Sequence, residues 1–357
     1  MRNLLQLTTV IAMCMLILSC QKERPASNAS IVVNEFPINL ELTPTIAPEF
    51  DEEIGLISIS KVGKYILATK AKQDYFFTIF DSEHTKLVDI CRKGNGPNEF
   101  IAPIYLEQYE VIGGETKIWV LERATNTFCL INIEQTIKEK ELVIDNQYDF
   151  HKLNKTELRH LFQINDSIFI GTAQCSESLE FKVTIFNIKN NAVTPKDNFL
   201  PFIEDAPAQN YQLTQNWLSL KPDKSAFVSS FSQIPELDLY KISGERYLSL
   251  FYKEILTPAD LLKTNTSVER DELGQTYATD SYIYVLSTES KEQGVYEYYI
   301  LVFNWDGKPI ARLKIAAADS FFVDEESRKI YTVCFEKDEG NVMTYDLPDL
   351  TQTVSAE

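Results

Sequence analysis

The sequence predicts an all-β protein, a six-bladed β-propeller built from four-stranded antiparallel blades, and three observations lead to this prediction. Apolar strand-like runs recur six times at a spacing of about 50 residues, close to the ~40–50 residues of propeller blades. Helical pattern is scarce within the repeats, which argues against βαβ units. The last repeat is one strand short, and a lone N-terminal strand precedes the first repeat. We expect that strand to close the ring.

The first twenty residues have the pattern of a targeting segment. Arg2 supplies a positive start, and the apolar stretch over residues 4–18 is short for a membrane span. It ends in Leu18-Ser19-Cys20, which resembles the bacterial lipobox, in which the cysteine is lipidated and becomes N-terminal after cleavage. A secretory signal with an incidental cysteine is the alternative. Because Gln21 is not the aspartate linked to inner-membrane retention, we expect an outer-membrane lipoprotein, facing the periplasm or the cell surface.

After this signal peptide, residues 21–30 are polar and are predicted to be a tether. Residues 31–357 are predicted to form a single propeller domain. Its first strand is expected at about residues 36–42, where Ile38, Leu40 and Leu42 alternate with polar side chains. This strand has no blade of its own. Pairing beside the last blade would close the ring and cover an edge that otherwise invites aggregation.

The repeat is clearest in the second and third strand of each blade. The second strands are expected at residues 65–68, 118–121, 168–171, 226–229, 283–286 and 330–333. The third strands are expected at residues 78–81, 130–132, 184–187, 239–241, 301–304 and 343–346. Polar turns precede most of the second strands, as suits a hairpin that joins a first strand to a second.

A hairpin over residues 299–315 is the sharpest single β signal. Two apolar runs flank Asp306-Gly307, and such a pair favours a two-residue type I′ turn, which needs φ > 0 at both positions. The best helical candidate is an insertion at residues 257–262, with Thr257 as N-cap and Pro258 in the first turn.

Charge and cysteine content narrow the classes of partner. The net charge of −18 disfavours binding to nucleic acid, although acidity also serves simple solubility. Beyond Cys20, the four cysteines at 91, 129, 175 and 334 lie far apart in apolar runs. We expect them to be buried and free, with a disulfide as the alternative. No metal site or other cofactor is expected, because ligand spacings and calcium loops are absent from the sequence.

A glycine-rich stretch, Arg92-Lys93-Gly94-Asn95-Gly96-Pro97-Asn98-Glu99-Phe100, follows the first repeat. Backbone amides in such a turn can form an anion-binding nest, assisted by Arg92 and Lys93. No Lys-Ser/Thr follows the glycines, so this is not a P-loop. The alternative is that the turn only shapes the crossing from one blade to the next.

Together with the lipobox and six repeats, the stretch Gly94-x-Gly96-Pro97-x-Glu99-Phe100 resembles the TolB-like six-bladed propeller lipoproteins of Bacteroidetes. The resemblance covers nearly the whole mature chain, and this motif is its one sharp local signature. The run from Val302 to Gly307 is similar to an NHL hairpin and supports the same fold. The resemblance implies a fold and an envelope location, and it carries no catalytic residues.

Three long connections between blades, at residues 145–160, 199–217 and 254–275, are expected at the channel mouth that binds ligands. Their exposed aromatic and polar side chains would suit a glycan or a peptide, although the same aromatics could pack the loops onto the blades. The ligand-binding candidates are Arg92, Lys93, Asn95, Asn98 and Glu99 in the glycine turn, and Tyr148, His151, His160, Phe202, Tyr211 and Trp217 on the connections.

Catalytic patterns are weak, because there are three histidines and no G-x-S-x-G nucleophile elbow. The sequence therefore favours a membrane-anchored, non-enzymatic binding propeller with a glycan, peptide or envelope protein as partner. An envelope hydrolase or lyase using carboxylates and histidine is the second hypothesis, and a purely protein-binding scaffold is the third. Converging carboxylates with His151 or His160 at the channel mouth would favour the enzyme.

Overall fold

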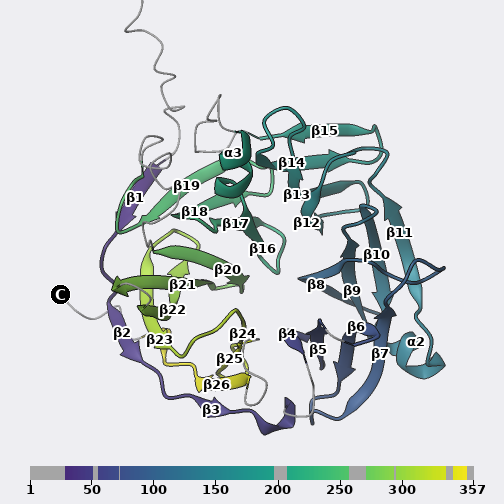
Figure 1. Ribbon diagram of the computed structural model, residues 1–357, viewed down its shortest axis with the longest axis horizontal. Coiled ribbons are helices and arrows are strands. Elements are labelled where there is room, and N and C mark those ends of the chain that lie inside the picture. Colours follow the sequence, from purple (N-terminus) through teal and green to yellow (C-terminus); the bar gives the residue numbers. More distant parts are fainter. Residues whose placement is uncertain are drawn as a thin grey trace, which may run out of the picture.

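The computed structural model describes residues 29–50, 55–71, 73–196, 207–256, 271–292, 295–334 and 341–351. Within them, six antiparallel sheets stand around a central axis as the blades of a propeller (Figure 1). The predicted fold class is therefore confirmed. The predicted lipidation site Cys20 and the helix predicted at residues 257–262 lie outside the described residues.

Each blade consists of four strands, with the first strand of the chain order innermost (Figure 1). The first blade contains β4 (Leu56–Val62), β5 (Tyr65–Lys70), β6 (Tyr75–Phe80) and β7 (Lys86–Arg92). The second contains β8 (Pro103–Ile112), β9 (Glu115–Glu122), β10 (Thr127–Asn132) and β11 (Ile144–Asp149), and the third β12 (Leu158–Gln163), β13 (Ile168–Gln174), β14 (Phe181–Asn187) and β15 (Ala192–Pro195).

The fourth blade contains β16 (Asn216–Leu220), β17 (Ala226–Phe231), β18 (Ile234–Lys241) and β19 (Arg246–Tyr252). The fifth contains β20 (Glu272–Ala278), β21 (Tyr282–Glu292), β22 (Val295–Asn304) and β23 (Pro309–Ile315). The sixth takes β24 (Ser320–Asp324), β25 (Lys329–Val333) and β26 (Val342–Asp346) from the end of the chain. All twelve predicted second and third strands lie in these positions.

The N-terminal segment forms a belt, β1 (Ala29–Val33), β2 (Ile38–Glu41) and β3 (Thr45–Ile46), around the outside of three blades (Figure 1). β1 pairs in parallel with β19, and β2 pairs in parallel with β23. β3 pairs antiparallel with β26 and supplies the fourth strand of the sixth blade. An N-terminal strand therefore completes the last blade, but the prediction that residues 36–42 do so is wrong. Alternation of apolar residues indicates a strand without naming its partner.

Two short helices lie outside the repeat, α2 (Ile133–Glu139) and α3 (Pro207–Leu213), and a 3₁₀ turn, η1 (Pro48–Phe50), follows β3. The Asn132 side chain caps α2 by accepting a hydrogen bond from the Gln135 backbone N–H at 3.1 Å. Lys140 ends α2 in a left-handed conformation. The Asn132-x-x-Gln135 spacing is a capping signal present in the sequence, although no helix was predicted here.

The hairpin of β22 and β23 has a different turn from the one predicted. Only Gly307 of the Asp306-Gly307 pair has a positive φ, at 77°. The ladder pairs Phe303 with Pro309 after a bulge, and the Asn304 side chain accepts from the backbone N–H groups of Asp306 and Lys308. The turn is a longer, bulged one instead of a two-residue type I′ turn. A Cβ at Gly307 would lie 2.2 Å from Leu248, so glycine is also needed for contact with the fourth blade.

The hydrophobic core lies between neighbouring blades, where the sheets face each other. Trp119 of β9 is buried and stacks on Phe128 with ring centroids 4.6 Å apart. All four described cysteines are free. Cys91, Cys129 and Cys334 are buried, as expected, and Cys175 is half-buried.

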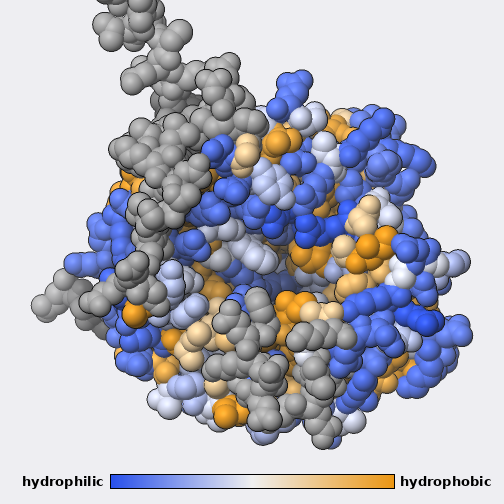
Figure 2. All heavy atoms as spheres, viewed as in Figure 1, coloured by the Kyte–Doolittle hydropathy of each residue, from blue (hydrophilic) through white to orange (hydrophobic). Residues whose placement is uncertain are grey.

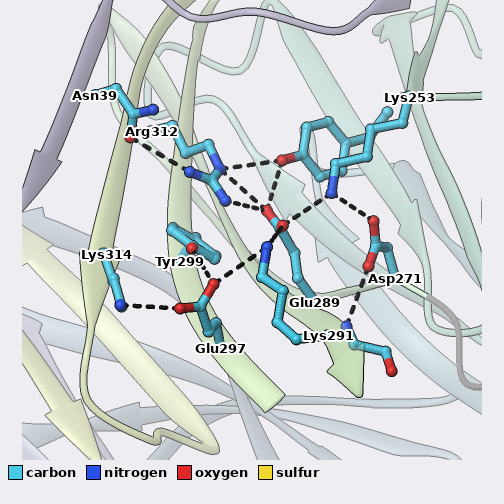
Figure 3. A network of polar contacts seen from close by, with 11 residues as sticks. Asn39, Lys253, Asp271, Glu289, Lys291, Glu297, Tyr299, Arg312 and Lys314 are labelled. Carbon is cyan, nitrogen blue, oxygen red and sulfur yellow. Dashed lines mark hydrogen bonds and ion pairs between the residues drawn. The ribbon is translucent and has the colours of Figure 1, made fainter. Parts of the chain in front are cut away.

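A polar network joins the fourth blade, the fifth blade and the belt around the buried side chain of Glu289 on β21 (Figure 3). Arg312 of β23 donates to Glu289 at 2.8 Å and 3.0 Å, and Lys253 donates at 2.8 Å. The Tyr252 hydroxyl of β19 donates at 2.6 Å. Arg312 also donates to Asn39 of β2 at 3.3 Å, so one carboxylate connects three parts of the chain.

Candidate functional site

The glycine turn after β7 holds a carboxylate from its own sequence. The Gly96 N–H donates to Glu99 Oε2 at 2.8 Å, and a Cβ at Gly94 would lie 2.0 Å from the same oxygen. Arg92 Nε lies 3.9 Å from Glu99 Oε1. One backbone N–H of the turn, that of Gly96, therefore binds a carboxylate, and this carboxylate is the chain's own Glu99.

The turn lines a cavity of about 390 Å³, to which Asn95, Asn98 and Glu99 contribute. Lys93 Nζ donates to the Ala71 carbonyl at 2.6 Å and lies over the Phe76 ring. Asn95 and Asn98 are exposed, and Asn98 has a φ of 61°. The turn links β7 of the first blade to β8 of the second, which agrees with the alternative that it shapes the crossing between blades.

The aromatic candidates on the connections are partly brought together. His160 lies on β12 and Trp217 on β16, the innermost strands of two adjacent blades, with ring centroids 6.3 Å apart. His160 is buried, and desolvation together with Arg159 and Arg123 lowers its pKa to about 3. This histidine is therefore neutral at physiological pH. Tyr211 of α3 packs on Phe181 instead, with centroids 5.4 Å apart.

The remaining candidates do not join this cluster. Tyr148 of β11 packs against Trp119 and Phe169 between the second and third blades, so it serves the core. His151 is exposed, and its backbone N–H donates to Asp149. Phe202 lies outside the described residues. His151 and His160 therefore do not converge with carboxylates as the enzyme hypothesis required.

The two ends of the central channel carry different parts of the blades. We call the end formed by the turns between first and second strands, at residues 63–64, 113–114, 164–167, 221–225, 279–281 and 325–328, the turn face. The end where each blade connects to the next is the connection face. His160 and Trp217 lie early in their strands and thus toward the connection face. The ring is hollowed at its centre (Figure 2).

A cavity of about 600 Å³ lies at the turn face, opposite the end where the sequence analysis expected a ligand. Five of the six blades contribute to its walls, and the lining includes Lys61 and Gly63, Glu107 to Tyr109, Leu220 to Pro222 and Lys224, Tyr277 to Asp280, and Val323 to Glu326. Sequence reasoning placed the site at the long connections because of their length and their aromatic and polar side chains. The turn face is built from short, ordinary hairpins.

Glu107 is the unusual residue of this cavity. It has a left-handed φ of 61° and lies in a bulge of β8, where three residues separate the ladder pairs of Tyr105 and Tyr109. Its carboxylate accepts a hydrogen bond at 2.9 Å from Gln275, which lies in a bulge of β20 on the opposite blade. Two bulges thus aim two polar side chains across the channel. Bulges and left-handed non-glycine residues are both enriched at functional sites.

The orientation of Gln275 is set by the backbone. Its Oε1 accepts from the Phe321 N–H at 3.0 Å, so its amide nitrogen must face Glu107. Desolvation raises the pKa of Glu107 to about 8, and the Gln275 hydrogen bond offsets only part of that effect. Within the described residues, no cationic side chain forms an ion pair with Glu107. At pH 7 this carboxyl is therefore mostly protonated.

The lysines that line the cavity already have carboxylate partners. Lys61 lies 3.0 Å from both Asp324 and Glu326. Lys221 lies 2.8 Å from Asp223, and Lys224 lies 2.9 Å from Glu110. Each of these three lysines is therefore already paired with a carboxylate of the protein.

Nothing in the sequence marked Glu107. It stands in a run of strand-like residues, and only the interruption of alternation at Leu106-Glu107-Gln108 signals a bulge.

Within the residues that the structure describes, no group of three or more His, Cys, Asp and Glu side chains could hold a metal ion. No helix among these residues is long and apolar enough to cross a membrane.

No protein-family model matches the chain, and no curated protein matches it. The chain is similar to the crystal structure of a member of the duf4221 family from Bacteroides vulgatus, with a TM-score of 0.56 and 13% identity, covering 88% of this chain and 96% of that chain. It is also similar to a protein of unknown function from Bacteroides caccae, with a TM-score of 0.42 and 9% identity, covering 74% and 83% of the two chains. The similarity to the duf4221 protein shows that the two chains share a fold.

Proposed function

We propose that this chain is an envelope lipoprotein whose propeller binds a small polar ligand in the turn-face cavity without converting it. The observation that carries the proposal is the cavity of about 600 Å³ containing Glu107, a half-buried carboxyl held in a strained bulge without a cation. Non-glycine residues in strained conformations cluster at active sites and ligand clamps. Tyr109 and Tyr277 line the same cavity and supply aromatic rings for contact with a ligand.

Anchoring through Cys20 is the second part of the proposal, and the lipobox and the resemblance to TolB-like propeller lipoproteins support it. β1 begins beside Leu248, near the start of β19, so the described chain begins on the turn-face side of the fourth blade. Eight residues separate Cys20 from Ala29 and can span at most about 30 Å. A short tether on this side would hold the binding cavity close to an outer membrane.

Replacing Cys20 tests the anchor. In cells expressing the full chain, we expect Cys20→Ala to move the protein from the membrane fraction to the soluble fraction, because no lipid would be attached. Fractionation followed by immunoblotting measures this, with Cys175→Ala as the control that keeps the lipobox intact. Membrane retention of the Cys20→Ala protein would contradict the lipoprotein assignment.

A ligand screen tests the binding site. Thermal-shift screening of the mature chain against glycans, peptides and amines should find a compound that raises the melting temperature. Ala278→Trp, which fills the cavity wall, should abolish that shift, whereas Val193→Trp on the outer strand β15 should keep it. A compound that stabilises both variants equally would place its site elsewhere, and a panel without any stabilising compound would contradict the proposal.

The enzyme alternative has one observation in its favour, the raised pKa of Glu107. A carboxyl that is still protonated near neutral pH can act as a general acid toward a leaving group. Turnover of a glycan or peptide that is lost in Glu107→Gln would replace the binding role with a hydrolase or lyase.

A further inference from the structure

We propose that the ligand of the turn-face cavity carries an alkylammonium group and that the Glu107 carboxylate is its counter-ion. This inference rests on the proposed function and names the chemistry that the site selects. It follows from the charges of the lining, from the lack of a cation at Glu107 and from the neighbouring tyrosines.

The charge balance of the lining favours a cation over an anion. Five carboxylates and three lysines line the cavity, and all three lysines are bound by carboxylates at 3.0 Å or less. An anionic ligand would have to displace one of those carboxylates. A cation would add the partner that Glu107 lacks within the described residues.

Two buried carboxylates of this chain, Glu289 and Asp238, have the cationic partner that the half-buried Glu107 lacks within the described residues. Glu289 is bound by Arg312 and Lys253, and Asp238 lies 3.4 Å from Arg246. Burying a carboxylate without a partner is costly, and the fold supplies a cation in both of those cases. At Glu107 it supplies only an amide, so one carboxylate oxygen is left for a ligand.

Tyrosine rings complete the site. Tyr109 is 43% exposed beside Glu107, and Tyr277 lines the same cavity. An alkylammonium group is attracted to the face of an aromatic ring, and the attraction grows as the group is desolvated. Burial raises the pKa of Tyr277 above its ordinary value, so this ring stays neutral when the surrounding solution is made mildly alkaline.

Binding of a cation here must release a proton at neutral pH. With a pKa of about 8, Glu107 is ionised in about a tenth of the molecules at pH 7 and in about nine tenths at pH 9. A cation binds the ionised form, so binding at pH 7 should release about 0.9 proton per site. Its apparent affinity should rise about tenfold between pH 7 and pH 9.

Choline and its uncharged carbon isostere, 3,3-dimethylbutan-1-ol, test the inference, because choline keeps its charge at every pH used. Isothermal titration in two buffers of different ionisation enthalpy gives both affinity and proton release. We expect choline to bind at least about tenfold more tightly than the isostere. Glu107→Gln should lose this preference and the proton release. Asp166→Asn, which alters an exposed carboxylate in the turn between β12 and β13, should keep both.

Three outcomes would overturn the inference. They are equal binding of choline and the isostere, unchanged choline binding by Glu107→Gln, and no binding of choline up to tens of millimolar. If an uncharged compound still requires the open cavity in the Ala278→Trp comparison, the proposed binding function stands and only the ammonium class fails. If no compound depends on that cavity, both proposals fail.

Discussion

Replacing Glu289 with alanine is expected to lower the free energy of unfolding by about 3 kcal/mol at pH 7. The side chain is fully buried between the fourth and fifth blades (Figure 3). Its removal would leave Arg312, Lys253 and Lys291 close together without their shared carboxylate. We expect the lower end of the range for broken buried ion pairs because these three cations are partly exposed.

Urea unfolding of both proteins at pH 7 measures the effect. Glu245→Ala is the matched control, since it removes an ion pair with Lys241 in which both side chains are more than half exposed. It should cost no more than about 1 kcal/mol. A Glu289→Ala protein within 0.5 kcal/mol of wild type would show that the network does not hold these blades together.

The same network predicts sensitivity to acid. Burial alone would raise the pKa of Glu289, but hydrogen bonds from Lys253, Tyr252 and Arg312 outweigh it and lower the pKa to about 2. Because the folded pKa lies below the unfolded value near 4.5, this stabilisation is present above pH 4.5 and is lost as the pH falls toward 2. The difference in the free energy of unfolding between wild type and Glu289→Ala should therefore decrease as the pH is lowered from 4.5 to 2.

The architecture could be predicted because it depends on local pattern. Each second strand, such as Ile118 to Leu121, has enough β-branched and apolar residues to indicate a strand by itself, and six copies at a spacing of about 50 residues indicate blades. The belt could be predicted only in part. Ile38 and Leu40 indicate a strand, but Leu40 is 44% exposed and this strand pairs in parallel with β23. Its partner is determined by contacts between residues far apart in the sequence.

The site was less predictable for a related reason. The glycine turn was predicted as an anion-binding conformation, and in the structure its Gly96 N–H binds Glu99, three residues further along the chain, a contact that depends on the backbone geometry. His160 and Trp217 meet because inner strands of neighbouring blades are adjacent in space. Glu107 needed two bulges on opposite sides of the ring, at β8 and β20, to meet Gln275. Sequence spacing carries no information on such a contact.

The second large effect concerns Glu107 itself. Desolvation raises its pKa to about 8, well above the ordinary value of 4.5 for a glutamate. Between pH 4.5 and pH 8 the folded protein therefore keeps a proton that the unfolded chain has already released. The free energy of unfolding should fall as the pH rises through this interval. Glu107→Gln removes the titrating group and keeps an oxygen that can accept from Gln275, so it should be more stable than wild type at pH 9.

Titration of the Glu107 carboxyl tests most directly that the turn-face cavity contains an uncompensated acid. Carbon-13 NMR of protein labelled at glutamate side-chain carboxyls, assigned by the resonance missing in Glu107→Gln, gives its midpoint. We expect a midpoint near pH 8, well above the ordinary value of about 4.5 for a glutamate. A midpoint near 4.5 would show a solvated or paired carboxylate and would contradict both the site and the ligand chemistry proposed for it.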